Sequence, residues 1–159
     1  MEYLFTPWRY EYVSTVDESD GCVFCDRPSD TDDRESLIVF RGELCFAILN
    51  RFPYPSGHLM VAPYAHTGTI EDLDRETLAD VMELVVRCMG AVREAFSPSG
   101  FNVGMNISRV AGAGIQDHVH VHVVPRWAGD SNFMTVCADT RVLPLSLDQV
   151  FEALEKRLA

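Results

Sequence analysis

The chain has 159 residues, of which 47% are apolar and 23% are charged, values typical of a globular protein rather than a disordered one. Its 24 acidic and 13 basic residues give a formal net charge of −11. A field of that sign repels nucleic-acid backbones and anionic membranes and so argues against both as partners. It leaves open a small nucleotide gripped by local backbone groups and a few side chains.

No targeting or membrane segment is recognisable. The N-terminal stretch MEYLFTPWRYEYV lacks a basic region followed by an apolar run, and no apolar run approaches the roughly 20 residues that span a bilayer. Five cysteines, an odd number, without a secretory signal indicate a reducing compartment. We therefore expect a cytoplasmic protein whose residues 1–159 form a single domain.

The sequence of the first half of the chain predicts a polar, turn-rich segment followed by strands. Residues 14–36 form the most polar stretch and contain many turn-forming residues. Short apolar runs separated by turn sequences then predict an antiparallel meander. These runs are 37–40, 44–49 and 58–63.

The second half predicts one long helix, two strands and a final helix. Apolar residues recur every three or four positions over 74–96, with Asp74 as the cap. Alternating strands follow over 101–107 and 118–125, around a glycine-rich turn. A last amphipathic helix covers roughly 146–158. The sum is an α+β fold with an antiparallel sheet of about five strands, one long helix packed on it and a C-terminal helix.

Three of the five histidines stand at alternate positions of the strand HVHVHVV. Side chains alternate faces along a strand, so His118, His120 and His122 point one way at roughly 6.5–7 Å spacing, and the valines point into the core. A polar outer strand with incidental histidines is the plain interpretation. The functional ones are a metal site and a histidine nucleophile, which needs one unprotonated ring nitrogen and a fixed tautomer.

Cys22 and Cys25 have the CxxC spacing that lets two thiolates bind one tetrahedral ion. Taken alone, the pair is equally compatible with a redox site or with coincidence. A thioredoxin-like pair would open a helix after a strand, whereas the surroundings here predict a polar loop. Cys45 and Cys88 lie in strand and helix patterns and are expected in the core.

The histidine motif matches the signature of the histidine triad (HIT) superfamily, and the resemblance covers nearly the whole chain. It extends to PWRYEYV, GCVFC, CFAILNRFPYPSGHLMVAPYAH, NVGMN, AGAGIQDHVHVHVVPRWAGDSNFM and TRVLPLSL. These strings resemble a bacterial branch related to diadenosine polyphosphate phosphorylases and hydrolases. The HIT-like fold is thereby implied.

The resemblance also implies roles for the site residues. His120 would be the nucleophile that attacks the α-phosphorus of a nucleotide. His122 would fix its tautomer or lie near the leaving oxygen, and His58 would lie beside the phosphates, with His118 completing the catalytic set. Asn50 would hold the ribose, although a turn role fits it too. Further phosphate contacts are expected from Asn106, Gly112, Gly114 and Gln116.

A structural zinc ion is implied in the same way. In the zinc-bearing branches of the superfamily, CxxC is joined by the first triad histidine and by a histidine after the third strand. The matching ligands are Cys22, Cys25, His118 and His66. Because His118 belongs to both sets, zinc would help to position His120.

The resemblance predicts cleavage of dinucleoside polyphosphates, such as diadenosine tetraphosphate, by phosphorolysis or hydrolysis. One alternative is a purine nucleoside phosphoramidase, a branch that usually carries a serine shortly before the triad, where this chain has Ile115. The other is a zinc-stabilised nucleotide-binding module without turnover, against which the intact triad argues. Relatives dimerise through elements like the long helix and the C-terminal segment, so a homodimer is expected.

Overall fold

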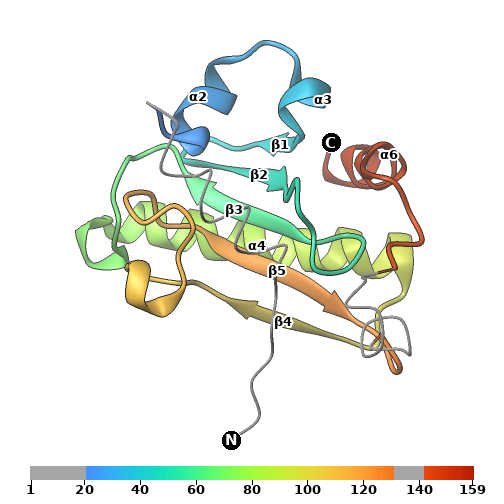
Figure 1. The fold of residues 1–159 in the computed structure, drawn as a ribbon. Coiled ribbons are helices and arrows are strands. Elements are labelled where there is room, and N and C mark those ends of the chain that lie inside the picture. The colour runs from blue at the N-terminus through green and yellow to red at the C-terminus, as the bar shows by residue number, and fades with distance from the viewer. Residues whose placement is uncertain (1–20, 131–141) are drawn as a thin grey trace, which may run out of the picture.

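The computed structural model describes residues 21–130 and 142–159. These residues form one five-stranded sheet, all of whose neighbouring strands are antiparallel, in the order β1-β2-β3-β5-β4 (Figure 1). The strands are β1 (Ile38–Arg41), β2 (Cys45–Leu49), β3 (Leu59–Pro63), β4 (Gly100–Gly104) and β5 (Val121–Arg126). The predicted α+β class and HIT-like antiparallel sheet are confirmed. The motif PWRYEYV and the NFM of the triad region lie outside the described residues.

Two long helices cover one side of this sheet. α4 (Arg75–Phe96) crosses behind it, and α6 (Leu147–Leu158) packs against α4 and β1 (Figure 1). The shorter helical segments are α2 (Val23–Ser29), α3 (Asp33–Ser36), η1 (Ile70–Asp72) and η2 (Arg109–Ala111). Among the described residues, no helix is long and apolar enough to cross a membrane.

The strands divide their side chains between two apolar clusters, as the period of two requires. Leu49, Val61 and Val123 face α4 and α6 in the larger cluster. Ile48 and Ala62 face the other way, in a smaller cluster with residues that include Phe24 of α2. Cys45 and Cys88 are buried in the larger cluster, which confirms their predicted core position.

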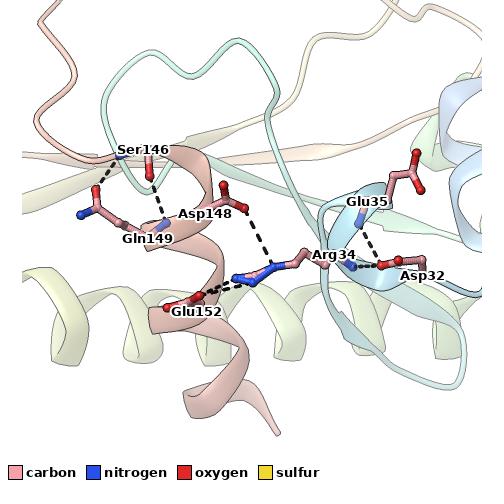
Figure 2. Close-up of polar contacts among 7 residues, drawn as sticks. All are labelled: Asp32, Arg34, Glu35, Ser146, Asp148, Gln149 and Glu152. Carbon is pink, nitrogen blue, oxygen red and sulfur yellow. Dashed lines mark hydrogen bonds and ion pairs between the residues drawn. The ribbon is translucent and has the colours of Figure 1, made fainter.

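Both predicted long helices begin at the residues that the sequence indicated. The Asp74 carboxylate accepts the Thr77 N–H at 2.7 Å and caps α4. Ser146 and Gln149 exchange side-chain and backbone hydrogen bonds at the start of α6 and form a capping box (Figure 2).

Three sequence expectations need correction. β5 begins only at Val121, so of the triad only His122 lies in the strand ladder. The chain before it is outside the ladder, and the Val119 N–H donates instead to the Thr67 carbonyl, beyond the end of β3. β4 likewise ends at Gly104, before the expected limit at residue 107. The CxxC pair does not lie in an irregular loop, because Cys22 is the N-cap of α2.

α3 is tied to the C-terminal helix by one arginine. The Asp32 carboxylate caps α3 by accepting the backbone N–H groups of Arg34 and Glu35. The Arg34 guanidinium then reaches α6, where it lies 2.5 Å from Glu152 and 3.9 Å from Asp148 (Figure 2). These charges are largely exposed, so the contact contributes little to stability.

Ser108, just before η2, has a backbone conformation that favours glycine. Its φ of 72° and ψ of 157° lie in a region that costs non-glycine residues about 1–3 kcal/mol. We expect Ser108→Gly to raise the free energy of unfolding by about 1 kcal/mol, after the added entropy of the unfolded chain is subtracted. Ser97→Gly, at an exposed αL helix end with φ 49°, is the matched control. Urea unfolding should show the larger gain at position 108; an equal or smaller gain there contradicts the assignment of strain.

Candidate functional site

The triad histidines lie side by side against α2 and β3, although the strand begins late. His118 and His120 are 0% and 5% exposed, whereas His122 is half-buried. The ring centroids of His120 and His122 are 4.9 Å apart. Although only His122 lies in the strand, two buried imidazoles and one accessible imidazole come together.

A backbone carbonyl fixes the tautomer of His120. Its Nδ1 lies 2.8 Å from the carbonyl oxygen of His118, and because a carbonyl only accepts, Nδ1 carries the proton. The Nε2 of the neutral ring then has a free electron pair. Burial lowers the pKa of His120 and favours this neutral form. The Phe24 ring packs against the imidazole with centroids 4.6 Å apart and restricts its rotation.

His122 belongs to a chain of hydrogen bonds that runs to His58. The backbone N–H of Tyr54 donates to His58 Nδ1 at 3.2 Å, so this nitrogen is an acceptor. The proton of neutral His58 is consequently on Nε2, which lies 3.0 Å from His122 Nδ1. His122 then keeps its own proton on Nε2. Of the two roles expected for His122, fixing the tautomer of His120 is performed by the His118 carbonyl. The role near the leaving oxygen stays a prediction.

Asn50 and Asn106 are two further residues expected to contact the nucleotide. Asn50 follows β2, and its side-chain oxygen accepts the Phe52 N–H at 2.9 Å. This contact stabilises a turn, so the turn role expected as an alternative for Asn50 is part of what it does. Its backbone N–H bonds the carbonyl of His58. Asn106 is half-buried in the segment after β4. Neither observation assigns a ligand, and both residues stay predictions.

The glycine-rich turn has a conformation that glycine alone adopts freely. Gly112 has φ 90°, and its N–H donates to the Arg109 carbonyl at 2.9 Å. That donor is used within the turn, so its direct contact with an anion is not supported. Gly114 and Gln116 follow in a bend leading to His118, and Gln116 is exposed. They also stay predictions.

Four side chains converge beside the triad in a cluster with metal-ligand chemistry. The ligand atoms of Cys22, Cys25, His66 and His118 all lie within 4.8 Å of one another. His118 Nδ1 is 3.4 Å from Cys22 Sγ and 3.5 Å from Cys25 Sγ. His66 Nδ1 is 3.2 Å from Cys25 Sγ. The four residues that the sequence predicted as zinc ligands are thus brought together.

These residues fit a tetrahedral zinc ion. With Zn–S near 2.3 Å and Zn–N near 2.0–2.1 Å, neighbouring ligand atoms of a tetrahedron lie roughly 3.3–3.8 Å apart, close to the distances found here. His118 Nε2 lies 2.8 Å from the Pro63 carbonyl and so carries the proton, which leaves Nδ1 free for a cation. Two sulfur and two nitrogen donors suit Zn²⁺ better than a hard cation.

Two cavities in the described part of the chain involve residues of this centre, the first through His58 and the second through His120. One, of about 380 Å³, lies between the loop after β2 and the start of α6, with His58, Arg51, Leu49 and Ser146 among its lining residues. The other, of about 220 Å³, is lined by His120 and by apolar side chains that include Pro63 and Met105.

Several residues of the site gave no signal in the sequence. The Tyr54 N–H and the carbonyls of Pro63 and His118 act through the backbone, so their residue types are uninformative. Phe24 lies in the CxxC motif, which drew attention to its cysteines alone. Gly68 is required because a Cβ there would lie 2.7 Å from the Gln116 carbonyl oxygen.

Comparison with known proteins assigns the family. Residues 31–129, more than half of the chain, match the family model of the HIT domain. With the fold and the three clustered histidines, this match shows that the chain belongs to the HIT family.

Two relatives and one solved structure are similar to this chain over two thirds or more of its length. "AP-4-A phosphorylase" of Mycobacterium tuberculosis is 38% identical over 152 residues, which cover 91% of this chain and 77% of the relative. "Adenosine 5'-monophosphoramidase hnt1" of Schizosaccharomyces pombe is 31% identical over 106 residues, covering 67% of this chain and 74% of the relative. The crystal structure of a Zn-bound histidine triad family protein from Mycobacterium smegmatis superimposes with a TM-score of 0.70 at 29% identity, covering 87% of this chain and 93% of that one.

Proposed function

We propose that this protein cleaves dinucleoside polyphosphates, with diadenosine tetraphosphate as the reference substrate, by nucleotidyl transfer through His120 and then to phosphate. The observation that carries this proposal is the 2.8 Å contact of His120 Nδ1 with the His118 carbonyl, which leaves Nε2 available as a nucleophile. The similarity to the M. tuberculosis phosphorylase supports the substrate class and the choice of phosphate as acceptor.

In the first step, His120 Nε2 attacks the α-phosphorus, and the bond from phosphorus to the bridging oxygen breaks. An AMP–histidine adduct forms, and ATP leaves. His122 Nε2–H can donate a hydrogen bond to the departing oxygen and so stabilise the charge that develops there. ATP leaves as an anion that needs no proton, and the 3.0 Å hydrogen bond from His58 Nε2–H to His122 Nδ1 holds the His122 ring. In the second step, phosphate attacks the same phosphorus, the P–N bond breaks, and ADP leaves with His120 restored.

We also propose that Cys22, Cys25, His66 and His118 hold a zinc ion. Four protein ligands close the coordination shell, so the ion supplies structural order and not an activated water. The fit of the ligand distances and the similarity to a Zn-bound relative support this assignment. His118 then connects the metal site to the carbonyl that orients His120. The homodimer and the cytoplasmic location stay predictions.

Product analysis on diadenosine tetraphosphate tests the reaction. With phosphate present, the proposal predicts ATP and ADP in equal amounts. Without phosphate, it predicts little turnover. ATP and AMP formed at the same rate with or without phosphate would make the protein a hydrolase and contradict phosphorolysis.

The phosphoramidase remains the alternative, because the S. pombe relative bears that name. In this chain, Ile115 packs against the smaller apolar cluster at the position where that branch usually has a serine. Rapid cleavage of an adenosine phosphoramidate together with inert diadenosine tetraphosphate would favour this alternative. The non-catalytic module would turn over neither substrate.

A further inference from the structure

α2 carries three groups that reach the site, yet it has little stability of its own. Cys22 caps it, Cys25 lies in its first turn, and Phe24 packs against His118 and His120. The helix has seven residues and contains Pro28. Isolated helices of this length do not persist in water, so contacts with the rest of the protein must set its position.

One arginine of the sheet binds two backbone carbonyls at the far end of α2. Arg41, the last residue of β1, donates to the Pro28 carbonyl at 2.7 Å and to the Asp30 carbonyl at 2.9 Å. Both carbonyls lie at the C-terminal end of α2, where a cation is favoured. Arg41 Nε also donates to the Asp33 carboxylate of α3 at 2.8 Å. A planar guanidinium can satisfy these acceptors together, which an ammonium group cannot.

Arg41 is also linked to the segment that supplies the histidine ligands. It pairs with Phe46 of β2 across the ladder, and the Phe46 ring stacks on Tyr64 with centroids 5.2 Å apart. Tyr64 is two residues before His66 and directly follows Pro63, whose carbonyl contacts His118 Nε2. Arg41 therefore contacts the segment that supplies the cysteines and is linked through Phe46 to the segment that positions the histidines.

We propose that Arg41 is a positioning residue for the zinc site, which sets the spacing between the cysteine pair and the histidine pair without binding the metal itself. This inference rests on the proposed zinc ion and goes beyond its four ligands. Nothing in the CxxC or triad motifs indicates it, because Arg41 is distant from both in sequence.

The role of Arg41 can be tested by measuring the zinc affinity of the full-length protein. We expect Arg41→Met to raise the zinc Kd, in competition with a chromophoric chelator, by about 10- to 100-fold, the usual effect of losing groups that orient metal ligands. Arg34→Met is the matched control. Arg34 lies in the same segment, but its ion pairs point to α6, so its loss should change the Kd by less than about twofold.

Two further measurements separate positioning from general loss of structure. Thermal unfolding of the metal-free proteins should show one cooperative transition for both variants, with a lower Tm for Arg41→Met because it loses three hydrogen bonds. The Co²⁺-substituted Arg41→Met protein should keep a tetrahedral absorption spectrum, because its four ligands are intact. If Arg41→Met does not fold, Arg41→Lys and Asp33→Asn take its place, with a Kd raised about threefold or more.

The outcomes are distinguishable. A wild-type protein that binds no zinc overturns the proposed metal site and this inference with it. A wild-type protein that binds zinc while Arg41→Met binds it equally well overturns only the role of Arg41. If Arg34→Met and Arg41→Met weaken zinc binding equally, the role of Arg41 is also overturned. Any contact that attaches α2 and α3 to the rest of the protein would then affect the zinc Kd.

Discussion

His120→Gln is expected to lower kcat on diadenosine tetraphosphate by on the order of 10⁴-fold or more, as removal of a nucleophile does in other covalent mechanisms. Glutamine keeps a polar side chain of similar length but offers no nitrogen lone pair to phosphorus. The substitution should leave zinc content unchanged, because His120 is outside the Cys22, Cys25, His66 and His118 cluster.

His122→Gln is the matched comparison for this result. It makes the same chemical change two residues further along, but it removes the imidazole N–H proposed to stabilise the departing oxygen and keeps the nucleophile. We expect its defect to shrink when the leaving group needs little such stabilisation, as with a nitrophenyl ester of AMP, while the defect of His120→Gln persists. Substantial activity in His120→Gln, or the same dependence on the leaving group in both variants, would contradict the assigned roles.

Cys25→Ser is expected to abolish tight zinc binding and to lower Tm by roughly 10 °C when zinc is in excess. A ligand present at a thousand times its Kd stabilises the folded state by about 4 kcal/mol, and a chain of this size loses roughly 2–4 °C per kcal/mol. Cys25 is only partly buried, so the sulfur-to-oxygen change costs little packing. Differential scanning fluorimetry with and without a chelator gives the comparison.

Cys88→Ala is the control, because it removes a thiol from the core outside the metal cluster. It should lower Tm in the presence and absence of the chelator alike, whereas Cys25→Ser should be insensitive to the chelator. Elemental analysis of protein purified without added metal completes the test. A wild-type Tm that the chelator does not change, with less than about half of the chains carrying zinc, contradicts the metal site.

The fold could be predicted from the sequence because its signals are local. The apolar period of α4, the Asp74 and Ser146 caps and the short runs of the meander each depend on nearby residues. The start of β5 depends instead on where its partner β3 ends. The Val119 N–H bonds Thr67 outside the ladder, and no pattern within HVHVHVV contains that information.

The candidate site, like the fold, could be predicted from the sequence only in part. The histidines and cysteines could be named because their side-chain chemistry is distinctive and the motifs resemble a known family. The groups that orient them are the carbonyls of His118 and Pro63, the Tyr54 N–H and the Arg41 guanidinium. The first three belong to the backbone, which every residue has, and the fourth is joined to its partners only by folding.

The most direct test is to locate the covalent intermediate. The protein is mixed with diadenosine tetraphosphate without phosphate, quenched in base to preserve a phosphorus–nitrogen bond, digested and mapped by mass spectrometry. The account predicts AMP on the peptide that contains the triad, with fragment ions that place it on His120 and none in His120→Gln. AMP on another residue, or substrate consumed with no adduct at any time point, contradicts the account.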